Sequence, residues 1–570
     1  AALDWTYTTN STTTLLTKYT GTKADVTVPA TLAAKPTMLS TAVFKGTNVN
    51  SVDLGGVNFA GNNMANTFNS CTNLKGITNL VNTVTEANDA FHGCTNLKSV
   101  VTCGNTCVAI SNGTNLFRNC GNLVSAPNHR FKNATATGMF NISHAFENCS
   151  NLITANTHSA AYIGYPLTSS IKPVDASYMF ANCTNLISIE DDEFLTTRCM
   201  GFNSNYSNMF MNCKSLTNTY NAFYAIYAGW NSDCSNMYSM CSNLTSSKTV
   251  FIAADDDDPT DININEMYGG CTNLTEVLCD LPKTTKMDRT FVGCRSLVTI
   301  PAIPNTVNSM NCTFGYCFEL ADIPAIPENV TNMSETFEGC YNLSIAPDIP
   351  ANVTDMYMTF YDCPNLVNAP VIPPNVANMA NTFYGCKNLK GDVMIFSNKI
   401  NSAGFNSTFL GTTKQKNVYM YNTGYNATAN SWAAAHNASA YFNGYNGVNV
   451  INMGTWENAS WTYTTSGANT LVTKYKGVNN IVYVPKMING RNVVLQNSAN
   501  RTSGVFTNNR SITKVMFNKD ISIANNNMAY TFANCTNLTN APIIPANVTN
   551  MCETFYDCRN LVNAPIIPAN

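Results

Sequence analysis

Residues 290–343 are TFVGCRSLVTIPAIPNTVNSMNCTFGYCFELADIPAIPENVTNMSETFEGCYNL, and they contain the phrase TF-x-x-C-x-x-L three times at intervals of 23 residues. The same phrase returns at 359–366 and 382–389. A fixed period in the twenties is typical of a solenoid, in which each repeat forms one coil stacked on the previous coil. Such a chain usually presents a surface, so we expect binding or structure rather than catalysis.

One period contains the parts of a single coil. In residues 366–389, LVNAPVIPPNVANMANTFYGCKNL, the segment LVNAPVI predicts a short strand that ends at Pro373. Met379 and Phe383 are four residues apart, which predicts a helical turn with both side chains on one face. Asn378 is a candidate cap for that turn. A lone coil buries too little apolar surface to offset its ordering entropy, whereas a stack of coils buries both faces of each member.

The cysteines follow the same period. Fifteen of the 22 cysteines lie three residues after the aromatic residue of the repeat. Cysteines at one phase face the same way on successive coils, whereas a disulfide needs side chains that point toward each other. We therefore expect a column of buried thiols rather than a disulfide framework, with a local Cys103–Cys107 bridge as a less favoured addition. The predicted column in the regular coils contains Cys294, Cys317, Cys340, Cys363 and Cys386, with Phe291, Phe314, Phe337, Phe360 and Phe383 beside them.

The composition argues against several classes of partner. Only 11% of residues are charged and the net charge is −3, so the chain lacks the basic surface of a nucleic-acid-binding protein. No apolar run is long enough for a membrane-spanning helix. The polar residues are mainly Asn, Thr and Ser, which suits a protein outside a cell or on a particle. The sequence starts AALDW without a signal-peptide pattern and ends within a coil at IIPAN, so we expect a longer natural polypeptide.

The segment IPENVTNMSETFEGCYNL (326–343) resembles the BspA-like leucine-rich repeats of bacterial surface proteins and their relatives in protozoa and phages. Met333 stands where that family usually has Ile, and Thr336 stands where it usually has Ala. The resemblance covers nearly the whole chain. It implies a leucine-rich-repeat solenoid of ~23-residue coils, with short parallel β-strands, helical turns and small β-rich N-terminal caps. It also implies surface attachment to host proteins, cells or glycans, but no binding motif carries over.

A second, longer repeat divides the chain into domains. The segment WTYTT occurs at 5–9 and again at 461–465, in each case before a predicted hairpin that resembles the N-terminal cap of BspA-like solenoids. The sequence predicts a β-rich cap at 1–60, a solenoid at 61–395 with insertions within 91–268, a C-terminal cap and junction at 396–456, a second β-rich cap at 457–525 and the start of a second solenoid at 526–570.

One acidic run, AADDDDPTDIN (253–263), contains oxygen ligands at a spacing that calcium accepts. The run lacks the glycine and the terminal glutamate of an EF-hand loop, so a solvated insertion is the favoured interpretation and a weak calcium site is the alternative. The candidate ligands are Asp255, Asp256, Asp257, Asp258 and Asp261. No other cofactor is expected.

The insertions around 162–230 are rich in aromatic residues. Aromatic rings beside Asn and Asp stack on sugar faces and hydrogen-bond to hydroxyl groups, which makes these residues candidates for glycan or protein contact. The favoured alternative is that they fold inward and cover the longer coils. The candidate ligand-binding residues are Tyr162, Tyr165, Tyr220, Tyr224, Tyr227 and Trp230.

Catalytic motifs are missing from the sequence, which contains no HExxH, GxSxG, GxGxxG or P-loop phrase. We therefore expect a non-catalytic, extracellular or cell-surface repeat protein that attaches to a host-surface protein or glycan through the side formed by residues 91–268. The alternative is a structural component of a fibre or particle, such as a bacteriophage tail or head fibre, on a virion surface and in contact with copies of itself.

Overall fold

The chain forms two compact units, residues 1–347 with 358–366 and residues 348–357 with 367–570. We describe each unit by itself. The computed structural model describes residues 2–103, 108–125, 129–131, 140–155, 173–188, 203–219, 225–226, 231–251, 261–390, 393–397, 399–400, 403–412, 416–420, 448–452, 460–477, 480–484, 487–488, 491–496, 498–517, 521–562 and 565.

The first unit begins with an antiparallel hairpin of β1 (Trp5–Thr9) and β2 (Thr14–Tyr19). The side chain of Asn10 holds the turn, because its Oδ1 accepts hydrogen bonds from the amides of Thr12 and Thr13 at 2.8 and 2.7 Å. Strand β2 then pairs in parallel with β5 (Lys35–Leu39), which starts the stack of coils. The hairpin thus covers the first coil of the solenoid.

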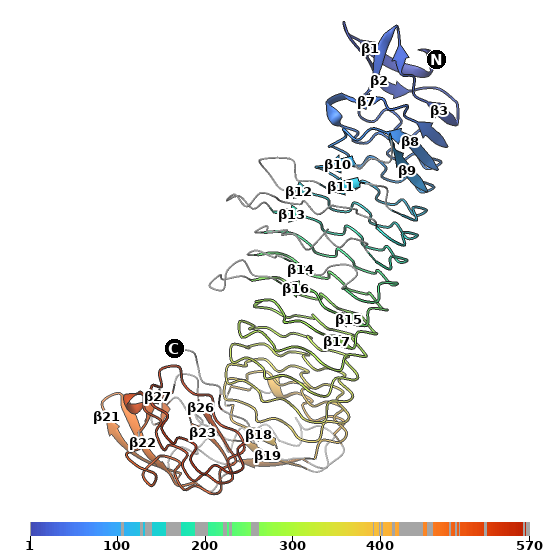
Figure 1. The fold of residues 1–570 in the computed structure, drawn as a ribbon. Coiled ribbons are helices and arrows are strands. Elements are labelled where there is room, and N and C mark those ends of the chain that lie inside the picture. Colours follow the sequence, from blue (N-terminus) through green and yellow to red (C-terminus); the bar gives the residue numbers. More distant parts are fainter. Residues whose placement is uncertain are drawn as a thin grey trace. The chain divides into compact units, whose positions relative to one another are not determined.

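Parallel pairing continues through this unit, and Figure 1 shows its coils stacked in chain order from β1 to β17. In the sheet β3–β6–β8–β9, Val26 pairs with Val52 and Val52 with Ile77, so one column of apolar side chains is buried. Further elements of this unit are η1 (Ala2–Asp4), β3 (Asp25–Thr27), β4 (Thr31–Leu32), β6 (Ser51–Asp53), β7 (Asn58–Phe59), η2 (Ala60–Asn62), β8 (Gly76–Leu80), β9 (Ser99–Thr102), β10 (Val108–Ile110), β11 (His129–Phe131), β12 (Phe140–Asn141), β13 (Val174–Asp175), β14 (Ala225–Ile226), β15 (Ser246–Ser247), β16 (Val250–Phe251) and β17 (Glu276–Val277).

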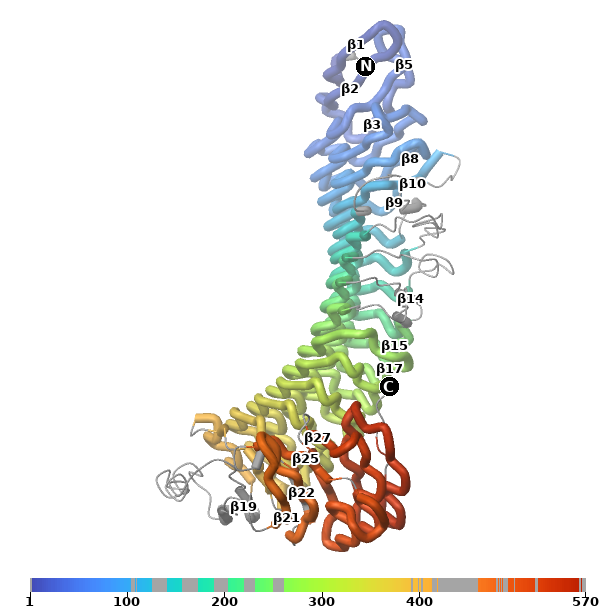
Figure 2. Tube along the Cα trace, turned by 90° about the vertical axis from the view of Figure 1, so that its left-hand side faces the viewer, coloured from blue at the N-terminus to red at the C-terminus, as the bar shows by residue number. Residues whose placement is uncertain are grey.

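The strands become very short in the regular coils. Between Lys286 and Asn332, successive coils meet through single parallel bridges such as Lys286–Ser309 and Ser309–Asn332. Each of these coils contains the segment P-A-I-P, and proline lacks the amide that a longer ladder requires. These coils are nevertheless stacked in chain order, as the tube trace in Figure 2 also shows.

The segment that carries the repeat phrase forms consecutive reverse turns. The amide of Thr290 bonds to the carbonyl of Met287 at 3.2 Å, and that of Cys294 bonds to Phe291 at 3.0 Å. Met287 and Phe291 share the buried side, as i, i+4 spacing predicts. The chain does not continue as a helix, because Arg289 between them has a positive φ of 57°.

An Asn or Asp starts most of these turns. The predicted cap Asn378 is an example, because its Oδ1 accepts a hydrogen bond from the amide of Ala380 at 3.2 Å. Asp233 and Asn332 accept the equivalent bonds from Ser235 and Ser334, both at 2.9 Å. The short side chain satisfies an amide that a turn otherwise leaves without a backbone acceptor, so the Asn-rich composition has a local structural cause.

Stacked aromatic rings form the centre of the first unit. Neighbouring rings of this aromatic ladder have centroids between 5.1 and 5.7 Å apart. Each ring is buried by the coil before and the coil after it, which explains why one aromatic per period suffices. The ladder comprises Phe44, Phe68, Phe91, Phe117, Phe146, Phe180, Phe210, Tyr238, Tyr268, Phe291, Phe314, Phe337 and Phe360.

The second unit repeats the hairpin of the first. Strand β21 (Trp461–Ser466) pairs with β22 (Asn469–Tyr475), and the register shifts between Thr462 and Tyr463 as it does between Thr6 and Tyr7 in the first hairpin. A buried cluster that includes Trp461, Phe506 and Phe532 forms its core. The remaining elements are β18 (Val393–Ile395), η4 (Ala403–Phe405), β19 (Lys416–Met420), β20 (Val448–Asn452), β23 (Ile481–Val484), β24 (Met487–Ile488), β25 (Arg491–Leu495), β26 (Lys514–Phe517), β27 (Ser522–Ile523) and η5 (Ala524–Asn526).

Candidate binding face and candidate metal centre

The thiols beside the aromatic ladder are buried and hydrogen-bonded. In the first unit, the Sγ atom of each donates to the carbonyl oxygen of the ladder aromatic in the preceding coil, at 2.9 to 3.2 Å. We call this set the thiol ladder: Cys71, Cys94, Cys120, Cys149, Cys183, Cys213, Cys241, Cys271, Cys294, Cys317, Cys340 and Cys363. The predicted column of buried thiols is confirmed, whereas the proposed Cys103–Cys107 bridge involves Cys107, which lies outside the described residues.

The environment of the thiol ladder suppresses thiolate chemistry. Burial raises the pKa of Cys149 and of Cys241 to about 12, and it raises the pKa of Cys183 and Cys213 well above the ordinary value of 9.0. A nucleophilic cysteine needs the opposite shift and access to solvent. The ladder thiols therefore serve packing.

A parallel row of threonine hydroxyls also lies inside the coils. The Oγ1 atoms of Thr313, Thr336 and Thr359 donate to carbonyls of the preceding coil, those of Met287, Met310 and Met333, at 2.8 to 2.9 Å. These buried hydroxyls are satisfied by the backbone. The Thr of the TF phrase is thus explained by structure, and this row offers no site for a ligand.

The outward face carries amide side chains in register. Asn148 Nδ2 donates to Asn119 Oδ1 at 2.7 Å, and the next two steps, from Asn182 to Asn148 and from Asn212 to Asn182, are both 2.8 Å. Each of these residues precedes a thiol-ladder cysteine and has a positive φ, a conformation that Asn accepts more readily than most residues. The row presents a line of hydrogen-bonding groups along four coils.

Three apolar side chains form an exposed strip on nearly the same coils. Val124, Ile153 and Ile187 each follow the buried Leu of their coil and are 48%, 42% and 49% exposed. They lie in register, because the amide of Ile153 bonds to the carbonyl of Val124 at 3.0 Å and that of Ile187 bonds to Ile153 at 2.9 Å. Single exposed apolar residues are common, but three in one line on adjacent coils form a continuous apolar stripe.

The predicted aromatic site residues cannot be placed on this face. Tyr162, Tyr165, Tyr220, Tyr224, Tyr227 and Trp230 all lie outside the described residues. Their proposed role in contacting a glycan or protein therefore stays a prediction. Tyr206, which lies in the same part of the sequence, is described and is buried.

The predicted calcium ligands Asp255, Asp256, Asp257 and Asp258 also lie outside the described residues. Asp261 is described and exposed, and its two carboxylate oxygens accept hydrogen bonds from the amide and the hydroxyl of Thr285, both at 2.8 Å. This carboxylate thus holds the start of the next coil. The calcium site stays a prediction.

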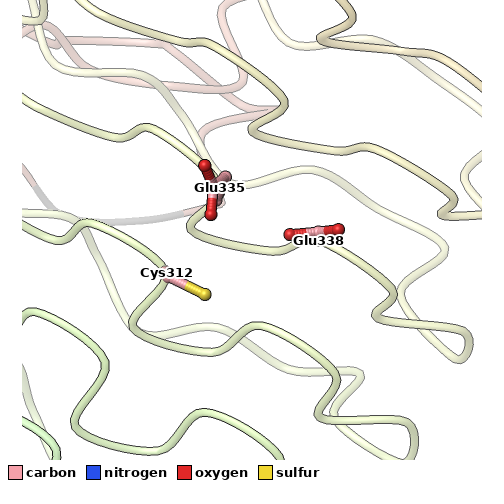
Figure 3. A group of neighbouring side chains, drawn as sticks. All are labelled: Cys312, Glu335 and Glu338. Carbon is pink, nitrogen blue, oxygen red and sulfur yellow. The ribbon is translucent and has the colours of Figure 1, made fainter.

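A different group of potential ligands is brought together in the regular coils. Figure 3 shows the sulfur of Cys312 and the carboxylates of Glu335 and Glu338 turned toward a common space, and their ligand atoms all lie within 4.8 Å of one another. Burial and the charge of Glu335 raise the pKa of the Cys312 thiol to about 12. Among the described residues, no other group of three such side chains meets this distance.

Sequence reasoning missed this group because Cys312 is not at the ladder phase. It lies two residues before Phe314, where the neighbouring coils have Arg289 and Glu335. The available signal was the spacing of 23 residues between Cys312 and Glu335, which places them on adjacent coils, together with Glu338 three residues later in the same turn. Cys312 is one of the seven cysteines that lie outside the shared phase of the repeat.

Comparison with known proteins identifies the repeat. The chain matches the model of a family described as BspA type leucine rich repeat region, in six copies, over residues 37–171, 260–367, 326–439 and 487–570. No curated protein matches the sequence at a significant level. Among the described residues, no helix combines the length and the apolar character needed to cross a bilayer.

Several solved structures are similar to the chain. A leucine-rich repeat protein from Bacteroides ovatus is 18% identical, with a TM-score of 0.43, over 72% of this chain and 98% of that chain. A leucine rich cell surface protein from Faecalibacterium prausnitzii is also 18% identical, with a TM-score of 0.31, over 75% and 95% of the two chains. The pneumococcal vaccine antigen PcpA is 12% identical, with a TM-score of 0.30, over 79% and 97%.

Proposed function

Because the chain belongs to the family of BspA-type leucine-rich repeat proteins, we propose that it is a non-catalytic attachment protein, displayed outside the cell, that binds a host-surface protein or glycan. The family occurs in bacterial surface proteins, and the low charge and Asn/Thr-rich composition suit that location. The buried, protonated thiols agree with a scaffold whose function lies on its outer face.

The exposed strip Val124–Ile153–Ile187 is the observation that carries this proposal. A partner that covers this apolar strip removes its surface from water, and the removal of apolar surface from water favours binding. The coils that carry the strip are longer than the regular coils. Phe117, Phe146 and Phe180 are 29 and 34 residues apart, compared with 23 in the regular coils, and insertions in solenoids often serve binding.

The chemistry of the Asn row and of the exposed strip favours a protein or a glycan over a nucleic acid. The row Asn119–Asn148–Asn182–Asn212 supplies amide donors and acceptors, and the strip supplies apolar contact. A phosphate backbone requires a line of Lys and Arg instead, and the chain has a net charge of −3. The predicted aromatic residues Tyr227 and Trp230 would add stacking surface for sugars.

The test is binding of the 570-residue chain to arrays of host glycans and matrix proteins. We expect a triple variant, Val124→Ser with Ile153→Ser and Ile187→Ser, to lose most of the binding while its melting temperature stays the same. The matched control is Val298→Ser with Ile345→Ser, which replaces exposed apolar residues outside the strip and should bind as the wild type does. A second variant, Tyr227→Ala with Trp230→Ala, tests the aromatic contribution.

Equal binding by the triple variant and the wild type would contradict a role for the strip. The absence of any array ligand, combined with concentration-dependent self-association in light scattering, would support the alternative. In that case the chain is a structural component of a fibre or particle, and copies of itself are its partners. An attachment protein should therefore bind an array ligand, whereas a fibre component should self-associate without one.

A further inference from the structure

We propose that Cys312, Glu335 and Glu338 form a binding site for one divalent transition-metal ion with an affinity for sulfur, zinc being the natural choice. The site would link two successive coils of the first unit, since Cys312 belongs to one coil and both glutamates belong to the next. Its residues differ from those of the exposed strip and of the predicted calcium site.

The coil geometry places two of the three ligands above one another. Cys312 and Glu335 both lie two residues before the ladder phenylalanine, and both have positive φ angles, of 50° and 56°. The amide of Cys312 bonds to the carbonyl of Ser334 at 2.8 Å, which fixes the register of the two turns. Glu338 closes the same turn as Glu335, because its amide bonds to the Glu335 carbonyl at 3.1 Å.

Gly315 makes room for the sulfur. This glycine occupies the position in its own coil that Glu338 occupies in the next, three residues after Cys312. A Cβ atom added to Gly315 would lie 2.6 Å from Cys312 Sγ, which is far too close for two such atoms. The thiol therefore fills the space that the missing side chain leaves, on the side of the coil where Glu335 and Glu338 lie (Figure 3).

The Cys312 thiol differs from the thiol ladder in its partners. Its side chain is buried, with 3% of the residue exposed. Each ladder thiol of the first unit donates to a backbone carbonyl, whereas no described atom accepts a hydrogen bond from Cys312 Sγ. A buried sulfur that lacks this bond and points toward two carboxylates is available to a metal ion.

The charges around the site favour a cation. Glu335 and Glu338 provide two carboxylates, and the nearby Arg289 is engaged in an ion pair with Glu266 at 3.4 Å. Tyr316 donates its hydroxyl hydrogen to Glu338 Oε1 at 2.5 Å, which orients that carboxylate. Hydrogen bonds to ligating carboxylates are a recurrent feature of metal centres.

The donor set decides the kind of ion. Zinc binds cysteine sulfur at about 2.3 Å and carboxylate oxygen at about 2.0–2.2 Å, so the ligand atoms of a filled tetrahedral site lie roughly 3.5 Å apart. The three atoms here lie within 4.8 Å of one another. Both glutamates are half-buried, and side-chain rotation that moves their carboxylate oxygens by about 1 Å would bring the ligand atoms to the spacing of a filled site. Calcium and magnesium select oxygen ligands alone, so the sulfur favours zinc or cobalt.

Binding forms a sulfur–metal bond in place of the sulfur–hydrogen bond. The thiol proton leaves to solvent, the metal keeps its oxidation state, and water occupies the fourth position. The filled site then has one thiolate and two carboxylates around a dication. Because the ligands come from two coils, occupancy should also raise the melting temperature of the chain.

The test is titration of the reduced 570-residue chain with Co²⁺, which replaces zinc and reports a thiolate ligand through a charge-transfer band in the near ultraviolet. We expect the band to saturate at one equivalent per chain and to disappear when Zn²⁺ is added. Cys312→Ser should abolish it, whereas Cys552→Ser, which changes an exposed cysteine of the second unit, should leave it unchanged.

Two further variants keep every ligand and separate metal binding from folding. Gly315→Ala should displace the Cys312 sulfur and weaken Co²⁺ binding while the fold without metal is retained. Tyr316→Phe should lower the affinity about 10- to 100-fold with the charge-transfer band retained at saturation. The absence of a band, or a band that persists unchanged in both Cys312→Ser and Gly315→Ala, would overturn the proposal.

Discussion

At the scale of single residues, the two tyrosines of the aromatic ladder show how the core accepts a polar atom. Tyr238 and Tyr268 stand where the other coils have phenylalanine, and burial raises the pKa of both hydroxyls. The Tyr268 hydroxyl lies 2.8 Å from Ser247 Oγ, and the Tyr238 hydroxyl lies 3.1 Å from Thr249 Oγ1. A buried hydroxyl is tolerated when it is paired, and both partner hydroxyls belong to the segment 247–249, which lies between Tyr238 and Tyr268 in the chain.

This pairing predicts a non-additive pair of substitutions. Tyr268→Phe removes one partner of the buried Ser247 hydroxyl and should lower the free energy of unfolding by about 0.5–1.5 kcal/mol. Ser247→Ala alone should have a comparable effect, and the double variant should lose less than the sum of the two. Urea denaturation of the four chains measures the coupling; strict additivity would show that the two hydroxyls do not interact.

The thiol ladder predicts loss of stability at high pH. Cys149 and Cys241 have a pKa of about 12 in the folded chain, compared with 9.0 for an exposed thiol. Between these values the unfolded chain has released its thiol protons and the folded chain has not. The free energy of unfolding should therefore fall as pH rises from about 9 to about 12, by about 1.4 kcal/mol per pH unit for each such thiol.

Urea midpoints measured from about pH 8 to about pH 11 check this expectation. Cys241→Ala should be less stable at the lower pH but should lose stability less steeply as the pH rises. The exposed-site control Cys552→Ser should keep the wild-type slope. Identical slopes for all three chains would show that the ladder thiols do not govern the alkaline transition.

At the scale of elements, the sequence predicted the coil better than its turn. The spacing of Met379 and Phe383 identified the buried side, and Asn378 was identified as the residue that caps the turn. A helical turn was expected, but Asn381 lies between them with a φ of 57°, and consecutive reverse turns result. The sequence signal for these reverse turns was the Asn or Gly that recurs at fixed positions of the repeat, since these residues accept a positive φ. The four-residue spacing of apolar residues contains no information on φ.

Two glycines, one with a positive φ and one without, should respond in opposite ways to substitution by alanine. Gly293 has a φ of 74°, and an added Cβ would meet only ordinary contacts, the nearest at 3.6 Å. Gly293→Ala should therefore cost about 1–2 kcal/mol through backbone strain alone. Gly121→Ala is the matched control, since its Cβ would meet Ser150 Oγ at 3.7 Å and its φ is not in that region. It should be neutral or stabilise by about 0.4–1 kcal/mol in the same denaturation assay.

At the scale of the whole molecule, periodicity predicted the fold and could not predict the sites. A strict period identifies which side chains repeat, so it identified the aromatic and thiol columns. The candidate sites are departures from the period. To predict the exposed strip, one must know that the residue after the buried Leu faces outward in these coils. To predict the Cys312 group, one must know that the missing side chain of Gly315 leaves room for the sulfur. Neither fact follows from spacing alone.

The repeats form stacked coils in which the thiols of the ladder are buried and unbridged, which leaves the outer face for binding. Thiol-specific alkylation of the native, unreduced chain, followed by peptide mass spectrometry, tests this claim coil by coil. We expect Cys552 to be labelled rapidly and the thiol ladder to be labelled only after a denaturant is added, with no reductant required. Ladder cysteines that react as fast as Cys552, or that react only after reduction, would contradict it.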